Sequence, residues 1–530
     1  MTWKDLSLTW HYVENNAENY PNDDAFIFED EKYTWKEFKI KVDQLAKALL
    51  KNDILKGDKV CLISMARNEF PLTFMAANKV GAMWFGLTPK YTIDEFRVMI
   101  SDAKPKIIFS VRKYLETDLT ETLNKLKNEF SFIKKLVIID EPFEGTENFE
   151  DFIKSAAEIS NEKLEQRADE LKSEDEALLL YTSGSTGKPK GVIHTHRSIL
   201  ANIRIQNDKF NSVHGIKAVC PYPINHVAAS TEFVISTIID GLTCEFLDKF
   251  DPVKILNIVG TDNINTVGGL PVTYLMMMST PEFAKTDFSR VGLFVFAGAA
   301  PTKKMVEVLN NISQKTGATI MTGYGSTEVG GFVTYSDPND GMEIILRAAG
   351  KIAEPFELKI VDDNRKKVPN GVIGEIALRG PFLMKGYLNN PEETAKVIDK
   401  DGWYYTSDLA YKDDTDNIYI TGRKSEMFKS GGENVFPLEI ENVLTTHSKV
   451  LFAAVLNVPD EFYQEVGWAF IIPNPGMSVS EEELQELCKS KLAIFKVPKR
   501  FLIRNSLPIT ESGKVDKVSL KKEIPELLNK

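Results

Sequence analysis

The stretch YTSGSTGKPKG (181–191) concentrates hydroxyls, glycines and two lysines directly after the apolar run ALLL. Hydroxyls, backbone N–H groups and ammonium groups are the donors that hold phosphate. A Walker loop has the form GxxxxGK[ST] and opens a helix. Here only two residues separate Gly184 from Gly187, and a strand-like run follows. The sequence therefore predicts a phosphate-binding loop between two strands, with Thr195 as the N-cap of the next helix.

Further stretches carry polar groups beside glycine turns or aromatic strands. GYGSTEVGG (323–331) combines glycines that permit close backbone approach, the flat face of Tyr324, and Glu328, whose oxygens suit a hard cation. WYYTSDLAY places Asp408 after an aromatic run, and LPITESGKVDK places Lys514 after a glycine turn. GRKSEMFKSGGENVFPLEIE holds a second Gly-Gly pair. Each of these stretches alone is a weak signal.

In this order and at these separations, the five stretches closely resemble the adenylate-forming superfamily. That superfamily contains acyl-CoA synthetases, carrier-protein-loading adenylation domains and firefly-type luciferases. The resemblance extends from about residue 30 to Lys517. It implies an AMP-forming acid–thiol ligase that uses ATP, Mg²⁺ and CoA. A substrate carboxylate would attack the α phosphorus of MgATP, pyrophosphate would leave, and a thiol would then take the acyl group from acyl-AMP.

The resemblance also assigns roles to residues of this chain. The phosphate loop would use Thr182, Ser183, Gly184, Ser185, Thr186, Gly187 and Lys190. The adenine pocket would comprise Gly298, Ala299, Ala300, Pro301, Gly323, Tyr324 and Gly325. Thr327 would face the α phosphate, Glu328 would bind Mg²⁺, and Asp408 with Arg423 would hold the ribose. The resemblance assigns catalytic roles to Lys514, Thr186, Lys190 and Glu328.

The acyl and thiol sites follow from the same resemblance. The acyl lining would be His226, Val227, Ala228, Gly269, Val272, Thr273 and Gly330, and the pantetheine tunnel would be Ser430, Gly431, Gly432 and Glu433. Amino-acid-activating relatives place an aspartate near this acyl position, and none occurs between Pro223 and Glu232. An unpaired ammonium in an apolar pocket is unfavourable, so a fatty or aromatic acid is favoured. The three methionines at 276–278 are expected in the core.

Three functions fit these motifs to different degrees. The leading one is a CoA ligase, and the second is a stand-alone adenylation enzyme that loads the pantetheine thiol of a carrier protein. The third is a nucleotide-binding regulatory or structural protein without turnover. Simultaneous presence of Lys190, Glu328, Asp408, Arg423 and Lys514 disfavours the third, because binding alone does not require all of them.

The elements that must position these residues show a repeated pattern. The first set has strands at 58–66, 82–87 and 106–110 and helices at 68–81 and 92–103. The second set has strands at 217–223, 242–247 and 264–269 and helices at 226–241 and 251–260. Such alternation predicts an α/β fold with two βαβ-type sheet layers. The expected domains are an N-terminal AMP-binding domain at 1–422, with repeat-like halves at about 30–200 and 201–340 and an antiparallel β unit at 341–422, and a small mobile α+β domain at 423–530.

Composition narrows the class of protein. The chain has 530 residues and a formal net charge of -12, without a separate basic cluster, which argues against nucleic acid as a partner. The amino terminus lacks a secretory h-region, and no run approaches the roughly 18 apolar residues of a membrane span. The four cysteines are far apart, so reduced, buried thiols in a cytoplasmic enzyme are expected. A monomer or a homodimer is compatible with the sequence.

Overall fold

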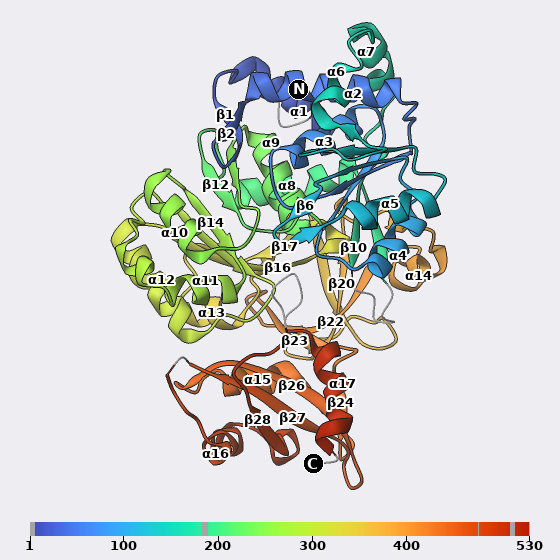
Figure 1. The fold of residues 1–530 in the computed structure, drawn as a ribbon. Coiled ribbons are helices and arrows are strands. Elements are labelled where there is room, and N and C mark those ends of the chain that lie inside the picture. Colours follow the sequence, from blue (N-terminus) through green and yellow to red (C-terminus); the bar gives the residue numbers. More distant parts are fainter. Residues whose placement is uncertain (1–5, 183–188, 475, 509–514, 529–530) are drawn as a thin grey trace.

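A computed structural model describes residues 6–182, 189–474, 476–508 and 515–528. Of the predicted site residues, Ser183, Gly184, Ser185, Thr186, Gly187 and Lys514 lie outside the described residues. The described residues form sheets of nine, eight, four, five and two strands. Figure 1 shows a large part that holds the first three of these sheets and a smaller C-terminal part, in red, beneath β22 and β23. The predicted α/β class with a larger N-terminal and a smaller C-terminal domain is confirmed.

The eight-stranded sheet carries the predicted phosphate loop. In spatial order its strands are β21 (Gly386–Tyr387), β11 (Lys190–Thr195), β10 (Glu176–Thr182), β4 (Met83–Leu87), β3 (Lys59–Ile63), β5 (Ile107–Ser110), β8 (Lys135–Ile138) and β9 (Glu147–Asn148). The strands from β10 to β9 are parallel, whereas β11 runs antiparallel to both β10 and β21. Thr182 is opposite Lys190 in the β10–β11 register. The predicted loop therefore falls between two strands, as expected, and these two strands are antiparallel.

The nine-stranded sheet holds most of the second repeat. In order it contains β18 (Lys351–Ile352), β17 (Gly331–Tyr335), β16 (Thr319–Ser326), β15 (Leu293–Ala297), β14 (Thr266–Gly269), β12 (Lys217–Cys220), β13 (Thr243–Phe246), β1 (Asp24–Phe28) and β2 (Glu31–Thr34). The strands from β16 to β1 are parallel. Strands β1 and β2 thus join the sheet of the second repeat although they precede the first repeat in the sequence.

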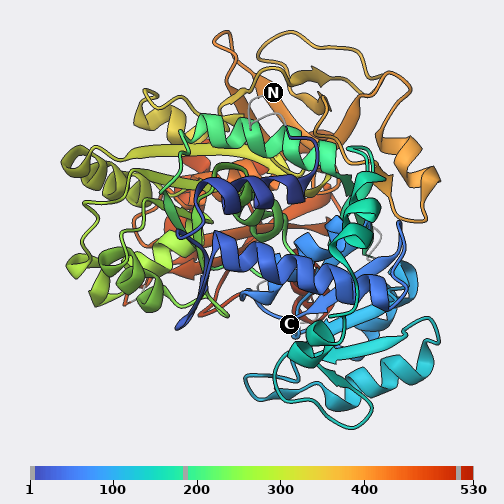
Figure 2. The ribbon, with the colours of Figure 1, turned by 90° about the horizontal axis from the view of Figure 1, so that it is seen from above.

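Helices cover both sheets and also lie between them. In the large part they are α1 (Thr9–Asn19), α2 (Trp35–Lys51), α3 (Glu69–Lys79), α4 (Ile93–Ala103), α5 (Thr120–Glu129), α6 (Phe149–Lys154), α7 (Asn161–Asp169), α8 (His196–Lys209), α9 (Ser236–Asp240), α10 (Pro252–Thr261), α11 (Pro271–Met278), α12 (Lys303–Thr316), α13 (Met342–Arg347) and α14 (Pro391–Val397). Short helices are η2 (Ala228–Ile235), η3 (Pro281–Lys285) and η4 (Thr327–Val329). Figures 1 and 2 show α1 and α2 side by side on top of the large part.

The main hydrophobic core joins the two large sheets. It contains strand residues of the eight-stranded sheet such as Trp84 and of the nine-stranded sheet such as Phe246, together with residues of α2, α3, α8, η2 and α9. Every residue of α3 is buried. Helix α8 begins where predicted, because Thr195 accepts a hydrogen bond from the Ser198 backbone N–H and the Ser198 side chain accepts one from the Thr195 backbone. The strand ends of both sheets are therefore fixed relative to each other.

The antiparallel β unit predicted at 341–422 contains a four-stranded antiparallel sheet. Its strands are β19 (Glu357–Val361), β20 (Gly374–Arg379), β22 (Tyr404–Lys412) and β23 (Ile418–Arg423). The smaller part has the strands β25 (Glu433–Val435), β24 (Phe428–Ser430), β27 (Gln464–Pro473), β26 (Val450–Asp460) and β28 (Arg500–Ile503), with α15 (Pro437–Leu444), α16 (Glu481–Lys491), η5 (Ile494–Lys496) and α17 (Lys517–Leu528). This mixture of helices and strands is the α+β composition expected of the C-terminal part.

The remaining expectations about the fold have mixed outcomes. All four cysteines are buried and free, as expected. Of the three methionines expected in the core, Met277 is buried, whereas the Met276 side chain is 43% exposed, so the expectation is wrong for Met276. Helix α11 presents one face to the sheet, and Met276 lies on the other. Within the described ranges, every helix is too short or too polar to traverse a bilayer.

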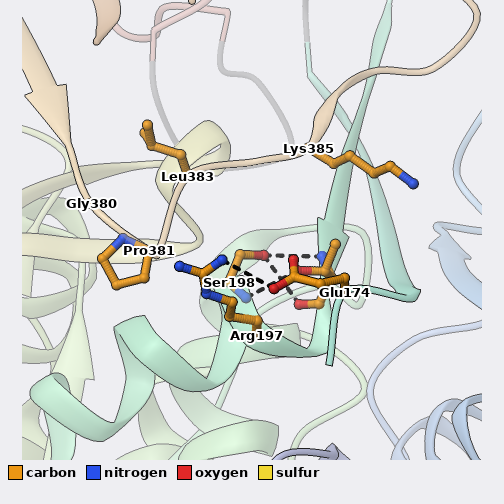
Figure 3. Close-up of a pocket in the computed structure, with 8 residues that line it drawn as sticks. Glu174, Arg197, Ser198, Gly380, Pro381, Leu383 and Lys385 are labelled. Atoms are coloured by element: carbon orange, nitrogen blue, oxygen red, sulfur yellow. Dashed lines mark hydrogen bonds and ion pairs between the residues drawn. The ribbon is translucent and has the colours of Figure 1, made fainter. Parts of the chain in front are cut away.

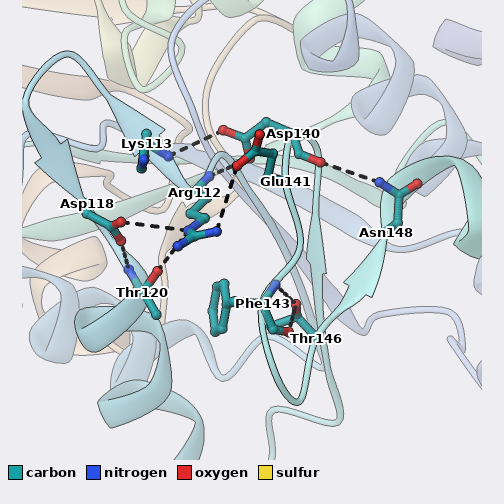
Figure 4. Close-up of polar contacts among 9 residues, drawn as sticks. All are labelled: Arg112, Lys113, Asp118, Thr120, Asp140, Glu141, Phe143, Thr146 and Asn148. Carbon is teal, nitrogen blue, oxygen red and sulfur yellow. Dashed lines mark hydrogen bonds and ion pairs between the residues drawn. The ribbon is translucent and has the colours of Figure 1, made fainter.

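A polar cluster at the far edge of the eight-stranded sheet fixes loops (Figure 4). Asp140, just after β8, accepts hydrogen bonds from the backbone N–H groups of Arg112 and Lys113. The Arg112 side chain donates to the Thr120 hydroxyl and lies 3.7 Å from Asp118, next to the two-stranded sheet of β6 (Lys113–Tyr114) and β7 (Thr117–Asp118). These groups pair with one another, so the cluster has a structural role.

Candidate active site

Two predicted nucleotide segments meet at the carboxyl ends of neighbouring parallel strands. Ala297, the last residue of β15, is opposite Gly323 of β16. The exposed residues Gly298, Ala299 and Ala300 follow β15 directly. Ligands of α/β sheets bind outside the carboxyl ends of the strands. The register therefore places the FAGAAP and GYGSTEVGG segments at one edge of the nine-stranded sheet.

Three predicted nucleotide-binding side chains contact one another at this edge. The Tyr324 hydroxyl donates to the Asp408 Oδ2 atom at 2.6 Å. The Arg423 Nε atom lies 3.1 Å from the Asp408 Oδ1 atom, and the two residues are opposite each other in the β22–β23 pair. Burial, followed by the Asp408 charge, raises the pKa of Tyr324 well above its ordinary value, and the Asp408 charge raises the pKa of Arg423. Asp408 is therefore a buried acceptor held from two sides.

We expect Asp408→Ala to weaken ATP binding by about 10- to 100-fold, because hydrogen bonds to charged groups contribute about 1.5 to 3 kcal/mol each. Isothermal titration calorimetry with ATP measures the change. Asp94→Ala is the matched control, since the Asp94 side chain is 85% exposed and belongs to a surface pair. Unchanged ATP affinity in Asp408→Ala would contradict a nucleotide role for this carboxylate.

Glu328 and Lys190 both contact Tyr387, one at its hydroxyl and the other over its ring. The Tyr387 hydroxyl donates to the Glu328 Oε1 atom at 3.2 Å, and the Lys190 Nζ atom lies 5.2 Å from the centre of the Tyr387 ring. Lys190 Nζ is also 2.7 Å from the Glu393 Oε2 atom at the start of α14. Lys190, followed by Lys396, lowers the pKa of Glu393 to about 2. The structure thus brings together two of the residues to which catalysis was assigned.

The residues around Glu328 fit a magnesium ion that phosphates also ligate. The Glu328 carboxylate is half-buried, and its oxygens match the preference of Mg²⁺. No group of three or more potential metal-ligating side chains occurs within the described parts of the chain. Mg²⁺ often binds through one or two carboxylates together with substrate phosphates, so one acid suffices at this position.

Buried side chains hold the backbone of GYGSTEVGG from behind. The Nε2 atom of His194 donates to the Thr327 carbonyl at 2.7 Å, and the Asn202 side chain donates to the Val329 carbonyl at 2.7 Å. Thr231 of η2 donates to the Gly330 carbonyl at 2.8 Å. Burial lowers the pKa of His194 to about 4, so the ring is neutral near pH 7. Sequence reasoning missed these supports, because each contact joins segments far apart in the chain.

The residues expected around the acyl group come from four segments: the start of η2, the turn after η4, β14 and α11. Val227 and Ala228 are buried, and His226 is half-buried with its ring stacked 6.1 Å from that of Tyr222. The bond from Thr231 to Gly330 brings η2 against the turn after β16. A methyl group added to Gly269 would lie 3.0 Å from Thr273, so β14 and the start of α11 are in close contact, beside the half-buried Val272.

The residues expected to line the thiol channel form a turn between β24 and β25. Ser430 is buried, whereas Gly431, Gly432 and Glu433 are exposed. The Gly431 N–H donates to the Tyr463 carbonyl at 2.9 Å. These contacts lie within the smaller C-terminal part, so they leave the position of this turn relative to the nucleotide residues as a prediction.

Two surface pockets lie apart from the predicted site residues. One, of about 310 Å³, is lined by Glu174, Thr195, Arg197, Ser198, Gly380, Pro381, Leu383 and Lys385 (Figure 3). Arg197 pairs with Glu174 at 3.0 Å, and Lys385 pairs with Glu176 at 2.9 Å. The other, of about 540 Å³, is lined mainly by charged residues between 30 and 150. Neither pocket contains a predicted site residue.

The fold and the residues at the strand ends define a nucleotide-binding enzyme of the adenylate-forming class. A family model described as AMP-binding enzyme matches residues 13–388, and one described as the C-terminal domain of AMP-binding enzymes matches residues 439–514. The chain therefore belongs to the AMP-binding enzyme family, and it is an AMP-forming acid–CoA ligase.

Similar proteins cover nearly the whole chain. An acyl-CoA ligase of Aspergillus fumigatus is 30% identical over 525 residues, which is 96% of this chain and 89% of that protein. The medium-chain fatty-acid–CoA ligase of Escherichia coli is 29% identical over 531 residues, 98% of this chain and 91% of that protein. The crystal structure of an anthranilate CoA ligase with anthranoyl-AMP shares the fold, with a TM-score of 0.88 at 24% identity over 98% of both chains.

Proposed function

We propose that this enzyme activates a fatty or aromatic carboxylic acid with ATP and transfers the resulting acyl group to CoA. The observation that carries the proposal is the contact of Tyr324, Asp408 and Arg423 at the strand ends that also carry Glu328. Tyr324 would face the adenine, and Asp408 with Arg423 would hold the ribose hydroxyls. In that pose the α phosphorus would face Thr327 and the acyl-lining residues.

Acyl-AMP formation would be catalysed by groups that stabilise charge on the phosphate oxygens. The substrate carboxylate forms a bond to the α phosphorus, the bond to the β-phosphate oxygen breaks, and pyrophosphate leaves. Lys190, Thr186 and Lys514 would donate to the phosphate oxygens, which stabilises charge without forming a covalent intermediate with the enzyme. Glu328 would hold Mg²⁺, which neutralises phosphate charge when bound. Tyr387 would orient the Glu328 carboxylate through its hydroxyl.

Different observations support the proposed acid substrate and the proposed thiol acceptor. Small or apolar residues in the acyl lining favour a fatty or aromatic acid, and the similarity to a medium-chain fatty-acid–CoA ligase supports the fatty class. The Gly-Gly turn after β24 is the proposed pantetheine channel. We also propose that residues 423–530 form a unit that moves between the two half-reactions, with the hinge near Arg423 to Glu426. Magnesium and CoA belong to this proposal.

ATP–pyrophosphate exchange across a panel of fatty and aromatic acids tests the first half-reaction, and CoA-dependent release of AMP tests the second. We expect exchange with at least one acid and AMP release that requires CoA. Exchange without CoA turnover would favour a carrier protein as the acceptor. Absence of exchange with every acid would contradict a fatty or aromatic substrate and favour a nucleotide-binding protein without turnover.

A further inference from the structure

Glu232 lies beside the proposed acyl site but has no role in the reaction described so far. It belongs to the π-helix η2, which also contains Ala228 of the expected acyl lining. A methyl group placed on Gly331 would lie 3.4 Å from the Glu232 Cγ atom. Gly331 directly follows the acyl candidate Gly330. Helical turns of the π type are frequent at functional sites. The Glu232 side chain therefore lies against Gly331 at the end of the GYGSTEVGG turn, on the side where Asn202 of α8 also lies.

The Glu232 carboxylate has no hydrogen-bond or ion-pair partner among the described residues. Its backbone carbonyl accepts from the Gln206 amide at 3.1 Å, but no donor reaches its side chain. The residue is half-buried although Gly331 and Tyr335 beside it are buried. Burial alone raises the pKa of Glu232 to about 8. Buried polar groups are normally paired, so a half-buried carboxylate with no protein partner among the described residues can accept a hydrogen bond from a ligand.

Other acceptors around Glu232 also lack donors. The Asn202 Oδ1 atom would lie 3.2 Å from the same added methyl on Gly331. Asn202 Oδ1 and Gln206 Oε1 are both buried and have no hydrogen-bond partner within the described ranges. The Tyr335 hydroxyl donates to the Phe332 carbonyl at 3.3 Å. Asn202 Oδ1 and Gln206 Oε1 thus leave two unpaired acceptors beside Glu232, whose carboxyl is a donor when protonated and an acceptor when ionised.

The position of Glu232 indicates which end of a substrate it would meet. Thr327 stands at the start of the turn, where the resemblance places the α phosphate, and Gly331 lies four residues further along. The reacting carboxylate must be next to the α phosphorus. A group that contacts Glu232 is therefore at the end of the acyl chain or ring away from the reacting carboxylate.

We propose that Glu232 selects acids that carry a hydrogen-bond donor, a hydroxyl or an amine, at the end remote from the reacting carboxylate. This inference rests on the proposed acid–CoA ligase function and narrows its substrate class. A plain alkyl or aryl end would cover the carboxylate without pairing it, which is unfavourable. A site built to pair with a polar group rejects analogues that lack it more strongly than an apolar pocket rejects an added methylene.

Three versions of one acid test the selection. We would measure kcat/KM of ATP–pyrophosphate exchange with para-hydroxy-, para-amino- and para-methyl-phenylpropanoate, and with octanoate bearing a terminal hydroxyl, amine or methyl. The wild-type enzyme is expected to prefer a donor-bearing acid over its methyl partner by about 10-fold or more. The hydroxyl and amine versions distinguish the two donors, and the ring and chain series distinguish the scaffold.

Glu232→Met removes the carboxylate at similar volume, and Glu162→Met on the exposed face of α7 is its control. We expect Glu232→Met to lose the preference for donors and to use the methyl acids about 10-fold better, because the pocket then lacks an unpaired acceptor. Glu162→Met should keep the wild-type preference. If Glu232→Met does not fold, the shift in melting temperature of the wild-type enzyme with each acid and AMP gives the same ranking.

The outcomes separate this inference from the proposed function. Exchange with the methyl acids at equal or higher efficiency than with the donor-bearing acids in the wild-type enzyme would overturn the selection by Glu232 but leave the ligase function intact. An unchanged preference in a folded Glu232→Met variant would also overturn it. No exchange by the wild-type enzyme with any acid would remove the ligase function, and this inference with it.

Discussion

Replacing Lys514 by alanine should lower the rate of adenylate formation by about 10² to 10³-fold, the usual effect of removing one donor aimed at a developing oxyanion. Lys514 lies outside the described residues, and its role is proposed from the LPITESGKVDK motif. Lys514 is assigned to the first half-reaction, in which charge develops on the oxygens around the α phosphorus; in the second, the thiol attacks the acyl carbonyl carbon and AMP leaves. Thioester formation from supplied acyl-AMP should therefore remain near the wild-type rate.

The two half-reactions are measured separately, by ATP–pyrophosphate exchange and by thioester formation from synthetic acyl-AMP and CoA. Lys522→Ala serves as the control, because Lys522 is exposed on α17 in the same C-terminal part. If Lys514→Ala lowered the rates of both half-reactions equally, the assigned role would be wrong. A lysine that acts only on the α phosphate should leave the rate of thioester formation unchanged.

Local sequence patterns predicted the elements of this fold because its central strands are buried on both faces. Such strands read as continuous apolar runs, and the runs at 58–66 and 217–223 correspond to β3 and β12. The helix expected at 68–81 is α3, whose complete burial explains its apolar sequence. The cap at Thr195 was also visible, because capping depends on residues only a few positions apart.

The parts that escaped prediction depend on contacts between distant segments. Neither the bond from His194 to the Thr327 carbonyl nor that from Tyr387 to Glu328 has a local signature. The pairing of Lys190 with Glu393 connects residues 203 positions apart. Glu232 was visible in the sequence, but its unpaired carboxylate becomes informative only when the structure shows its neighbours.

The structure describes some of the predicted nucleotide-binding residues and not others. Tyr324, Asp408 and Arg423 form one contact network, whereas the centre of the phosphate loop and Lys514 are outside the described residues. The motifs themselves identify residue types but not their distances. The network therefore adds geometry that the motifs lack.

The strongest steric prediction concerns Gly325, which lies between Tyr324 and the residues expected at the α phosphate. A Cβ atom at this position would lie 1.9 Å from the Gly331 carbonyl oxygen and 2.6 Å from its carbon. Both are backbone atoms of the facing strand β17, so no side-chain rotation can relieve the overlap. The alanine must separate β16 from β17 and displace Tyr324, Thr327 and Glu328 with them.

We expect Gly325→Ala to destabilise the protein by about 1 to 3 kcal/mol, as overpacking does, and to lower ATP–pyrophosphate exchange by about 10²-fold, since a shift of roughly 1 Å in positioning groups has that effect. Urea unfolding and the exchange assay measure the two changes. Gly341→Ala is the matched control, because its φ is -70° and an added Cβ has nothing within 4 Å. Wild-type exchange in Gly325→Ala would show that the turn tolerates a wider β16–β17 spacing, and it would contradict the close backbone approach as a requirement for nucleotide binding.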